Sequence, residues 1–203
     1  MSELRSRFGE IDIYLFDQLL KGRFDGARTV LDAGCGAGRN LVYFLQNGFD
    51  VFGTDRDPEA VVRVRRLAER LAPHAPTDRF HHATVEAMPF GDASMDAVLS
   101  SAVLHFADGE AHFAAMLDEM WRVLRPGGLF FARLASSIGI EERVVPIQGR
   151  RHHLPDGSER FLVDAHFLAE HAGRLGALPL DPLKTTIVQD LRAMTTWCLR
   201  KPG

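Results

Sequence analysis

The chain has 203 residues, 46% of them hydrophobic and 25% charged, and its formal net charge is −3 at pH 7. This length suits a single domain with a sizeable core, and the composition is that of an ordinary soluble protein. Because nucleic-acid binding calls for a basic surface, the acidic balance argues against a nucleic-acid partner and favours a small molecule.

The cysteines and the N-terminal residues indicate the cellular compartment in which the protein is expected. Cys35 and Cys198 do not make a disulfide framework, which favours a reducing compartment. The N-terminal residues lack the apolar core of a secretory signal, and no apolar run is long enough to span a bilayer. We therefore expect a cytoplasmic protein that has no membrane partner.

The first two thirds of the chain alternate short apolar runs with amphipathic stretches. Residues 11–21 predict a helix within an N-terminal cap. Strands are predicted at residues 29–33, 50–55, 79–85, 95–101 and 129–134, and helices between them at 39–47, 57–71 and 110–124. This alternation is typical of a doubly wound, mostly parallel sheet with helices on both faces.

The pattern changes after Ser137. Residues 136–162 are polar and basic in patches, which predicts an insertion on the substrate side of the sheet. A helix is expected at 163–175, followed by a closing antiparallel hairpin built from residues 183–189 and 192–199. The whole is one α/β domain with a Rossmann-like sheet of seven strands. Its parts are the cap (residues 1–27), a cofactor-binding core (28–135), the insertion (136–162) and the terminal helix and hairpin (163–203).

The turn after the first strand carries three alternate glycines, Gly34, Gly36 and Gly38. Without Cβ atoms, they let backbone N–H groups approach a ligand at the start of a helix. Asp55 ends the next strand, where an acid suits the hydroxyls of a ribose. A dinucleotide turn needs its third glycine one residue later, where Arg39 stands, so a dinucleotide-dependent oxidoreductase is the disfavoured alternative.

Residues 30–38 (VLDAGCGAG) resemble motif I of the class I S-adenosylmethionine-dependent methyltransferases. Asp55, residues 85–98 and residues 124–128 resemble later elements of that family in the expected order, the second of them as in its type 11 group. Motif I is also similar to that of tellurite-resistance methyltransferases. The resemblance implies that S-adenosylmethionine is the cofactor and S-adenosylhomocysteine the product.

The resemblance also implies roles for individual residues. Asp32 receives the ammonium group of the cofactor, Asp55 binds the ribose, and Ser101 and Leu104 flank the cofactor. Thr84 stands where the family often has an acid near the adenine, so that contact is expected from Val85 or Glu86. The expected cofactor-binding residues are Asp32, Gly34, Cys35, Gly36, Asp55, Arg56, Val85, Glu86, Ser101 and Leu104.

Candidates for the chemistry lie around the fourth strand and the insertion. His105 stands where a general base faces substrate, although packing of the cleft wall explains it equally well. Tyr14, Arg133 and Arg151 are candidate substrate contacts, the arginines through their affinity for anions. No histidine or cysteine spacing is typical of a zinc site, so we expect no metal.

These observations predict a methyltransferase that acts on a small-molecule acceptor by in-line displacement. Residues 101–104 (SAVL) replace the Asn/Asp-Pro-Pro-aromatic signature of amino-group DNA methyltransferases, which argues further against a nucleic-acid substrate. A non-catalytic S-adenosylmethionine-binding protein is the alternative. The sequence fits a monomer or a homodimer equally well.

Overall fold

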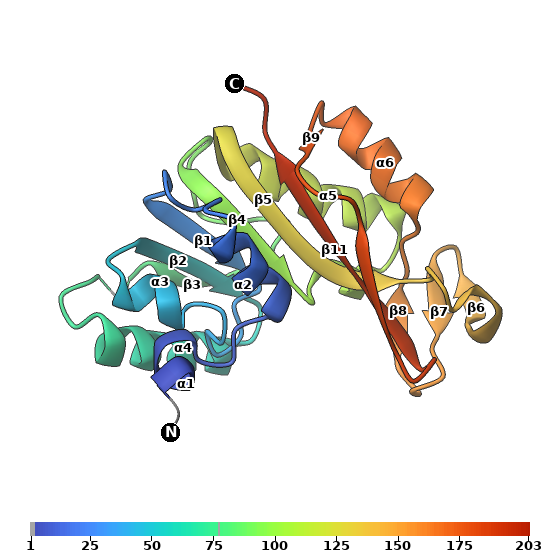
Figure 1. Cartoon of the computed structure of the whole chain (residues 1–203), viewed down its shortest axis with the longest axis horizontal. Coiled ribbons are helices and arrows are strands. Elements are labelled where there is room, and N and C mark those ends of the chain that lie inside the picture. The colour runs from blue at the N-terminus through green and yellow to red at the C-terminus, as the bar shows by residue number, and fades with distance from the viewer. Residues whose placement is uncertain (1–2, 77) are drawn as a thin grey trace.

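The computed structural model describes residues 3–76 and 78–203 and has a central eight-stranded sheet (Figure 1). Seven strands follow in the order β10-β11-β5-β4-β1-β2-β3, and the short β9 pairs with β11. Their bounds are Thr29–Ala33 (β1), Asp50–Asp55 (β2), Phe80–His82 (β3), Met95–Ser101 (β4), Leu124–Ser136 (β5), Leu178–Pro179 (β9), Lys184–Val188 (β10) and Arg192–Arg200 (β11). Strands β1 to β5 are parallel and β11 is antiparallel to β5. The predicted fold class is confirmed.

Helices cover both faces of this sheet, as the continuous apolar character of its strands predicts. Neighbouring residues of one strand point to opposite faces, so Phe130 packs in the core beneath α5 and α6 and Phe131 in the core beneath α3 and α4. The helices are α1 (Glu3–Phe8), α2 (Ile13–Leu20), α3 (Val42–Gln46), α4 (Pro58–Leu71), α5 (Glu110–Val123) and α6 (Ala165–Arg174).

The N-terminal cap contains two helices where the sequence predicts one. The polar sequence of α1 has no apolar stripe, and its one large aromatic residue explains its position: Phe8 packs against Phe16 and stacks on Tyr43. The second helix, α2, begins after Asp12, whose side chain accepts a hydrogen bond from the N–H of Tyr14. The cap therefore rests on α3, the helix that follows the glycine turn.

Three element boundaries differ by three residues or more from those predicted. Strand β3 ends at His82, because the chain leaves the sheet once its residues have paired with the end of β2. Helix α3 begins at Val42, since the turn after β1 extends through Leu41. Strand β5 begins at Leu124, directly after α5, and its Pro-Gly-Gly segment forms an irregularity within the strand instead of preceding it.

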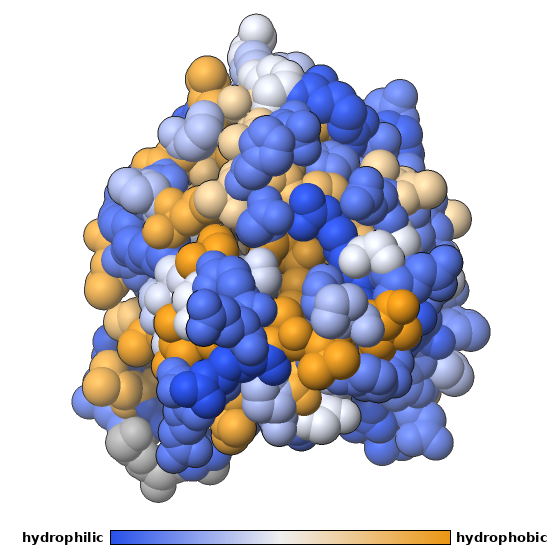
Figure 2. All heavy atoms as spheres, turned by 90° about the vertical axis from the view of Figure 1, so that its right-hand side faces the viewer, coloured by the Kyte–Doolittle hydropathy of each residue, from blue (hydrophilic) through white to orange (hydrophobic). Residues whose placement is uncertain are grey.

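The insertion folds into a small antiparallel sheet, which the sequence does not predict. Its strands are β6 (Val145–Gln148), β7 (Arg151–His153) and β8 (Glu159–Phe161), each only three or four residues long. The small sheet lies beside the tip of the β10–β11 hairpin (Figure 1). Figure 2 views this end and shows hydrophilic residues surrounding a hydrophobic band. No helix in the described part of the chain is long and apolar enough to cross a bilayer.

Candidate active site

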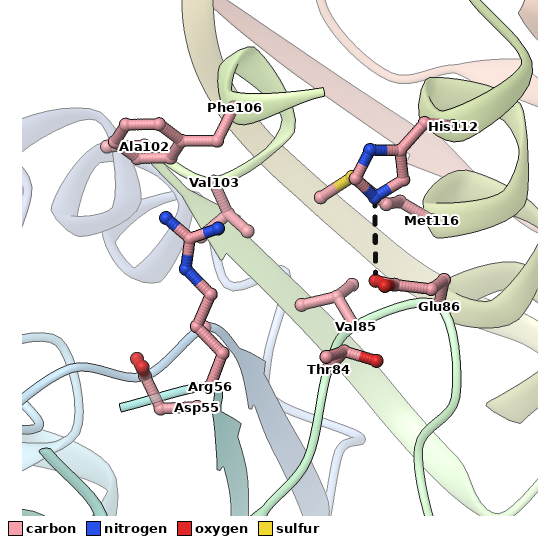
Figure 3. Close-up of a pocket in the computed structure, with 11 residues that line it drawn as sticks. Asp55, Arg56, Thr84, Val85, Glu86, Ala102, Val103, Phe106, His112 and Met116 are labelled. Atoms are coloured by element: carbon pink, nitrogen blue, oxygen red, sulfur yellow. Dashed lines mark ion pairs between the residues drawn. The ribbon is translucent and has the colours of Figure 1, made fainter. Parts of the chain in front are cut away.

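The site begins where the strand order reverses, between β1 and β4. In such sheets, ligands bind beyond the carboxyl ends of the strands at this point. A cavity of about 200 Å³ lies there (Figure 3), and we call it the strand-end cavity. Its walls are Gly34, Asp55, Arg56, Thr84, Val85, Glu86, Ala102, Val103, Phe106, His112 and Met116.

The three glycines of the turn have different roles. Gly34 and Gly36 adopt φ values of 81° and 54°, in the left-handed region that favours glycine. A Cβ atom at Gly34 would collide with the side chain of Val103, whereas one at Gly36 would meet nothing within 4 Å. A Cβ at Gly38 would lie 2.7 Å from Leu67, so this third glycine allows α4 to pack closely. Open space beside the backbone is therefore found at Gly36.

Asp32 is a buried carboxylic acid without a full set of partners. Its side chain is 2% exposed, and its Oδ1 atom has no hydrogen-bond partner among the described residues. Burial raises the pKa of Asp32 to about 7, while the nearby Arg39 acts in the opposite direction. A buried oxygen in this state favours a ligand that brings a donor or a positive charge.

Asp55 is held at the rim of the turn by two backbone N–H groups. Its carboxylate accepts hydrogen bonds from Gly36 at 2.8 Å and from Asp57 at 2.9 Å. These bonds fix the carboxylate on one wall of the strand-end cavity, opposite Glu86 (Figure 3). Glu86 lies 3.7 Å from the His112 ring, so two polar groups of different elements meet on that opposite wall.

A second cavity of about 340 Å³ adjoins the first, and we call it the hairpin-side cavity. Ala102 and Phe106 line both cavities. The other walls come from the 3-10 helix Leu104–Phe106 after β4, from β5, from the small sheet and from the β10–β11 hairpin. They are His105, Arg133, Ala135, Leu154, Asp156, Ser158, Arg160, Val188, Arg192 and Met194. The molecule thus offers two neighbouring binding spaces at one end of its sheet.

His105 lies in the wall of the hairpin-side cavity. It is 5% exposed, and its Nδ1 accepts a hydrogen bond from the N–H of Ala135 at 3.2 Å. Burial, and next the charge of Arg160, lower the pKa of His105 to about 4. The ring is therefore neutral at pH 7, and because Nδ1 accepts, the proton is on Nε2.

Of the expected substrate contacts, Arg133 lines the hairpin-side cavity and Arg151 lines neither cavity. Arg133 pairs with the buried Asp12 at 3.0 Å, and its guanidinium lies 5.2 Å from the ring centre of Tyr14. The Tyr14 hydroxyl is hydrogen-bonded to Thr186. Arg151 pairs with Glu159 within the small sheet.

Five of the expected cofactor residues, Gly34, Asp55, Arg56, Val85 and Glu86, line the strand-end cavity. The other five do not line it: Asp32, Cys35, Gly36, Ser101 and Leu104. The Cys35 thiol is buried in the core beneath α4, where burial raises its pKa, and Leu104 is fully buried. The Ser101 hydroxyl accepts a hydrogen bond from Arg39 and donates one to Asp12.

Sequence reasoning missed several residues of the two cavities. Phe106 follows His105 directly, but nothing in the pattern distinguishes it from a core aromatic residue. Arg160 and Arg192 come from distant segments and meet only after folding. The missed residues with polar or aromatic side chains are Phe106, His112, Asp156, Ser158, Arg160 and Arg192.

Comparison with known proteins identifies the family to which this fold belongs. A family model described as a methyltransferase domain matches residues 31–132, which hold the glycine turn and both shared wall residues. This chain belongs to that family. It is 30% identical over 168 residues to a malonyl-[acyl-carrier protein] O-methyltransferase of Enterobacter lignolyticus, with 81% of this chain and 61% of that protein aligned. An uncharacterized methyltransferase of Synechocystis is 34% identical over 103 residues, 51% of this chain and 45% of that one. The chain spans about half the length of these curated relatives.

Solved structures agree on the fold. One is the 1,6-didemethyltoxoflavin-N1-methyltransferase of Burkholderia thailandensis, solved with bound 1,6-didemethyltoxoflavin and S-adenosylhomocysteine. It matches this chain with a TM-score of 0.72 and 22% sequence identity, over 99% of this chain and 82% of that one. The [4+2]-cyclase SpnF reaches 0.71 at 18% identity, over 92% of this chain and 81% of the cyclase. Because a cyclase has this fold as well, the fold alone does not define the reaction.

The family implies S-adenosylmethionine as cofactor, and the residues of the methyltransferase domain fit it. Asp32 supplies a buried oxygen that has no partner among the described residues, which suits the ammonium group. The open space at Gly36 admits ligand atoms close to the backbone, and the fixed Asp55 carboxylate is available to ribose hydroxyls. No group of three His, Cys, Asp or Glu residues suited to a metal ion occurs within residues 3–76 and 78–203.

Proposed function

We propose that the protein is an S-adenosylmethionine-dependent methyltransferase, with the cofactor in the strand-end cavity and a small-molecule acceptor in the hairpin-side cavity. The observation that carries this proposal is the adjacency of the two cavities, which share Ala102 and Phe106. Methyl transfer needs two ligands in contact, and these cavities offer two binding spaces that meet at one wall.

The cofactor supplies an electrophilic methyl group on a sulfonium, so the protein's contribution is binding and alignment. Asp32 compensates the positive ammonium group within a buried environment, and Asp55 holds the ribose. Ala102 and Phe106 line the junction of the two cavities, beside which the two ligands meet. The cofactor would supply the methyl group for an in-line displacement, with its sulfur as the leaving group, and the residues of the hairpin-side cavity would hold the acceptor atom on the other side of that methyl group.

His105 serves this reaction as a neutral hydrogen-bond donor. Its Nδ1 lone pair is used by the N–H of Ala135, and its pKa of about 4 makes it a weak base. The Nε2–H group is left for an acceptor in the hairpin-side cavity. An acceptor with an available lone pair needs no general base, so orientation by His105 suffices.

Calorimetric titration separates this function from dinucleotide chemistry. The protein should bind S-adenosylmethionine and S-adenosylhomocysteine and should not bind NAD. Asp55→Ala should weaken binding of both by tenfold or more, about the effect of lost hydrogen bonds to a charged group. Asp25→Ala is the matched control, because Asp25 is an exposed acid that lines neither cavity. Binding of NAD alone would refute the proposal.

A screen for release of S-adenosylhomocysteine then tests catalysis. Candidate small molecules are added with S-adenosylmethionine, and the Asp55→Ala variant gives the background. Release that depends on one acceptor supports transfer. Tight cofactor binding without release across the screen would favour the non-catalytic alternative.

A further inference from the structure

We propose that the acceptor carries an oxyanion, a carboxylate or a phosphate, which Arg160 and Arg192 hold in the hairpin-side cavity. This inference rests on the proposed function and adds the chemical class of the acceptor. It starts from the charges in the cavity wall, which are three guanidinium groups and one carboxylate, Asp156.

Arg133, the first of these arginines, is already neutralised. Its guanidinium lies 3.0 Å from the carboxylate of Asp12, whose side chain is fully buried. The same guanidinium covers the ring of Tyr14. Arg133 therefore holds the N-terminal cap against β5, and Asp12 neutralises its charge.

Arg160 and Arg192 differ from it in having no ion-pair partner within 4.0 Å among the residues that the structure describes. The Asp156 carboxylate is engaged by Ser158, at 3.0 Å from its N–H and 2.6 Å from its hydroxyl. Both arginines help to lower the pKa of Asp156, but only as the smallest contributions, after the hydrogen bonds from Ser158. The one carboxylate near these two guanidinium groups is therefore hydrogen-bonded to Ser158 and forms an ion pair with neither of them.

Two other arginines of the insertion do form ion pairs, and they lie outside the cavity. Arg150 pairs with Asp164 at 2.8 Å and Arg151 with Glu159 at 3.1 Å, and neither lines the hairpin-side cavity. The guanidinium groups that line the cavity without an ion pair are those of Arg160 and Arg192. A forked guanidinium matches the geometry of a carboxylate or a phosphate, so an oxyanion is the ligand that this wall favours.

The position of Arg160 indicates how such an acceptor lies. Its guanidinium is 4.9 Å from the ring centre of Phe106, the residue shared by the two cavities, and Arg56 approaches the same ring from the strand-end side at 5.6 Å. An oxyanion on Arg160 is therefore close to the shared wall. Leu154, Val188 and Met194 supply apolar surface for the body of the acceptor.

The oxyanion serves as an anchor, and a different atom of the acceptor receives the methyl group. Oxygens that accept charge-assisted hydrogen bonds from two guanidinium groups have their lone pairs engaged, which makes them poor nucleophiles. The predicted acceptor is thus a small molecule with an anionic end, an apolar body and a separate nucleophilic atom.

The test measures binding of three small probes to the protein saturated with S-adenosylhomocysteine. Benzoate and phenyl phosphate carry the two oxyanions on the same ring, and benzamide is the neutral counterpart. By isothermal titration, at least one anion should bind and benzamide should bind at least about tenfold more weakly. Which anion binds more tightly distinguishes carboxylate from phosphate.

Variants locate the binding. Arg160→Gln and Arg192→Gln should each weaken binding of the preferred anion about tenfold or more, whereas Arg174→Gln should leave it unchanged. Arg174 lies on α6, pairs with Asp118 and lines neither cavity, so its variant controls for the loss of one positive charge. Thermal unfolding of each variant checks that the fold is intact.

The possible outcomes distinguish a failure of the anionic acceptor from a failure of the proposed methyltransferase function. If S-adenosylhomocysteine does not bind at all, the proposed function fails. If it binds, but neither anion binds better than benzamide, or both cavity variants bind as the parent does, the cofactor site stands and the anionic acceptor is refuted.

Discussion

Asp32 couples the cofactor site to pH. A carboxylic acid whose pKa is raised to about 7 by burial is largely protonated below that pH, whereas a bound ammonium group favours the carboxylate. Binding of S-adenosylmethionine therefore releases a proton from Asp32. The affinity should rise by up to about tenfold per pH unit as the pH approaches about 7 from below, and level off above it.

Titration calorimetry between about pH 5.5 and about pH 8 measures this slope, and two buffers with different ionisation enthalpies count the released proton. Asp32→Asn is the control: it keeps the shape of the side chain but has no titratable proton, so it should bind more weakly and without the slope. A parent protein whose affinity is flat over this range would contradict the role given to Asp32.

His105 makes the stability of the folded protein depend on pH. Its pKa is lowered from 6.5 to about 4 in the folded protein, so the unfolded chain binds more protons between these values. The free energy of unfolding should therefore fall as the pH falls from about 6.5 to about 4, by about 1.4 kcal/mol for each unit of the shift at most. Urea unfolding of the parent and of His105→Asn, compared at each pH, isolates this contribution.

The two replacements of His105 should differ. His105→Ala leaves the buried N–H of Ala135 without an acceptor, at a cost of about 1–3 kcal/mol, while His105→Asn retains a side-chain oxygen that can accept it. Equal stability of both variants above about pH 7 would show that this hydrogen bond is not the reason for the burial of the ring.

At the scale of elements, the sequence predicts the ends of helices and strands best where a capping residue, a proline, a glycine or a polar residue marks them. Asp57 caps α4 and Pro58 occupies its first turn, as the pattern indicates. Strands β1, β2 and β4 have their predicted bounds, because the glycine turn follows β1 and polar residues end β2 and β4. The strands of the insertion are too short to show a period. Their arrangement depends on packing against the hairpin, so the sequence alone could not place Arg160 beside Arg192.

The N-terminal cap is held to the sheet by the buried Asp12. Its carboxylate accepts hydrogen bonds from the N–H of Tyr14, from Arg133 and from the Ser101 hydroxyl, and Arg39 lies 3.6 Å away. Three of these partners lie on different elements, so this one side chain joins the cap to the glycine turn, β4 and β5.

Asp12→Ala should therefore release the cap. The loss of the helix cap and of the ion pair should lower the free energy of unfolding by about 2–4 kcal/mol, the sum of the usual costs of each. Hydrogen exchange should increase in residues 11–20 more than in the central sheet. Asp25→Ala, which removes an exposed acid of the same segment, is the control. Uniformly faster exchange across the sheet would mean that Asp12 supports the whole fold and not the cap in particular.

At the scale of the whole molecule, two parts of the chain meet at Phe106. The doubly wound core presents Arg56 to one side of this ring, and the small sheet presents Arg160 to it from the hairpin-side cavity. The ring is 44% exposed, so it is not held by burial alone. A residue that lines both cavities in this way should influence both ligands.

Phe106→Ala should weaken binding of S-adenosylhomocysteine and of the preferred anionic probe together, each by about three- to tenfold. The expected size follows from the loss of one cation–π contact and of apolar area on each side of the ring. Phe106→Tyr keeps the ring and should bind both ligands as the parent does. Val62→Ala, at an exposed apolar residue of α4 that lines neither cavity, controls for a loss of surface area. Separate titrations of the two ligands measure the two effects. Weaker binding of only one ligand would mean that Phe106 does not contribute to both cavities.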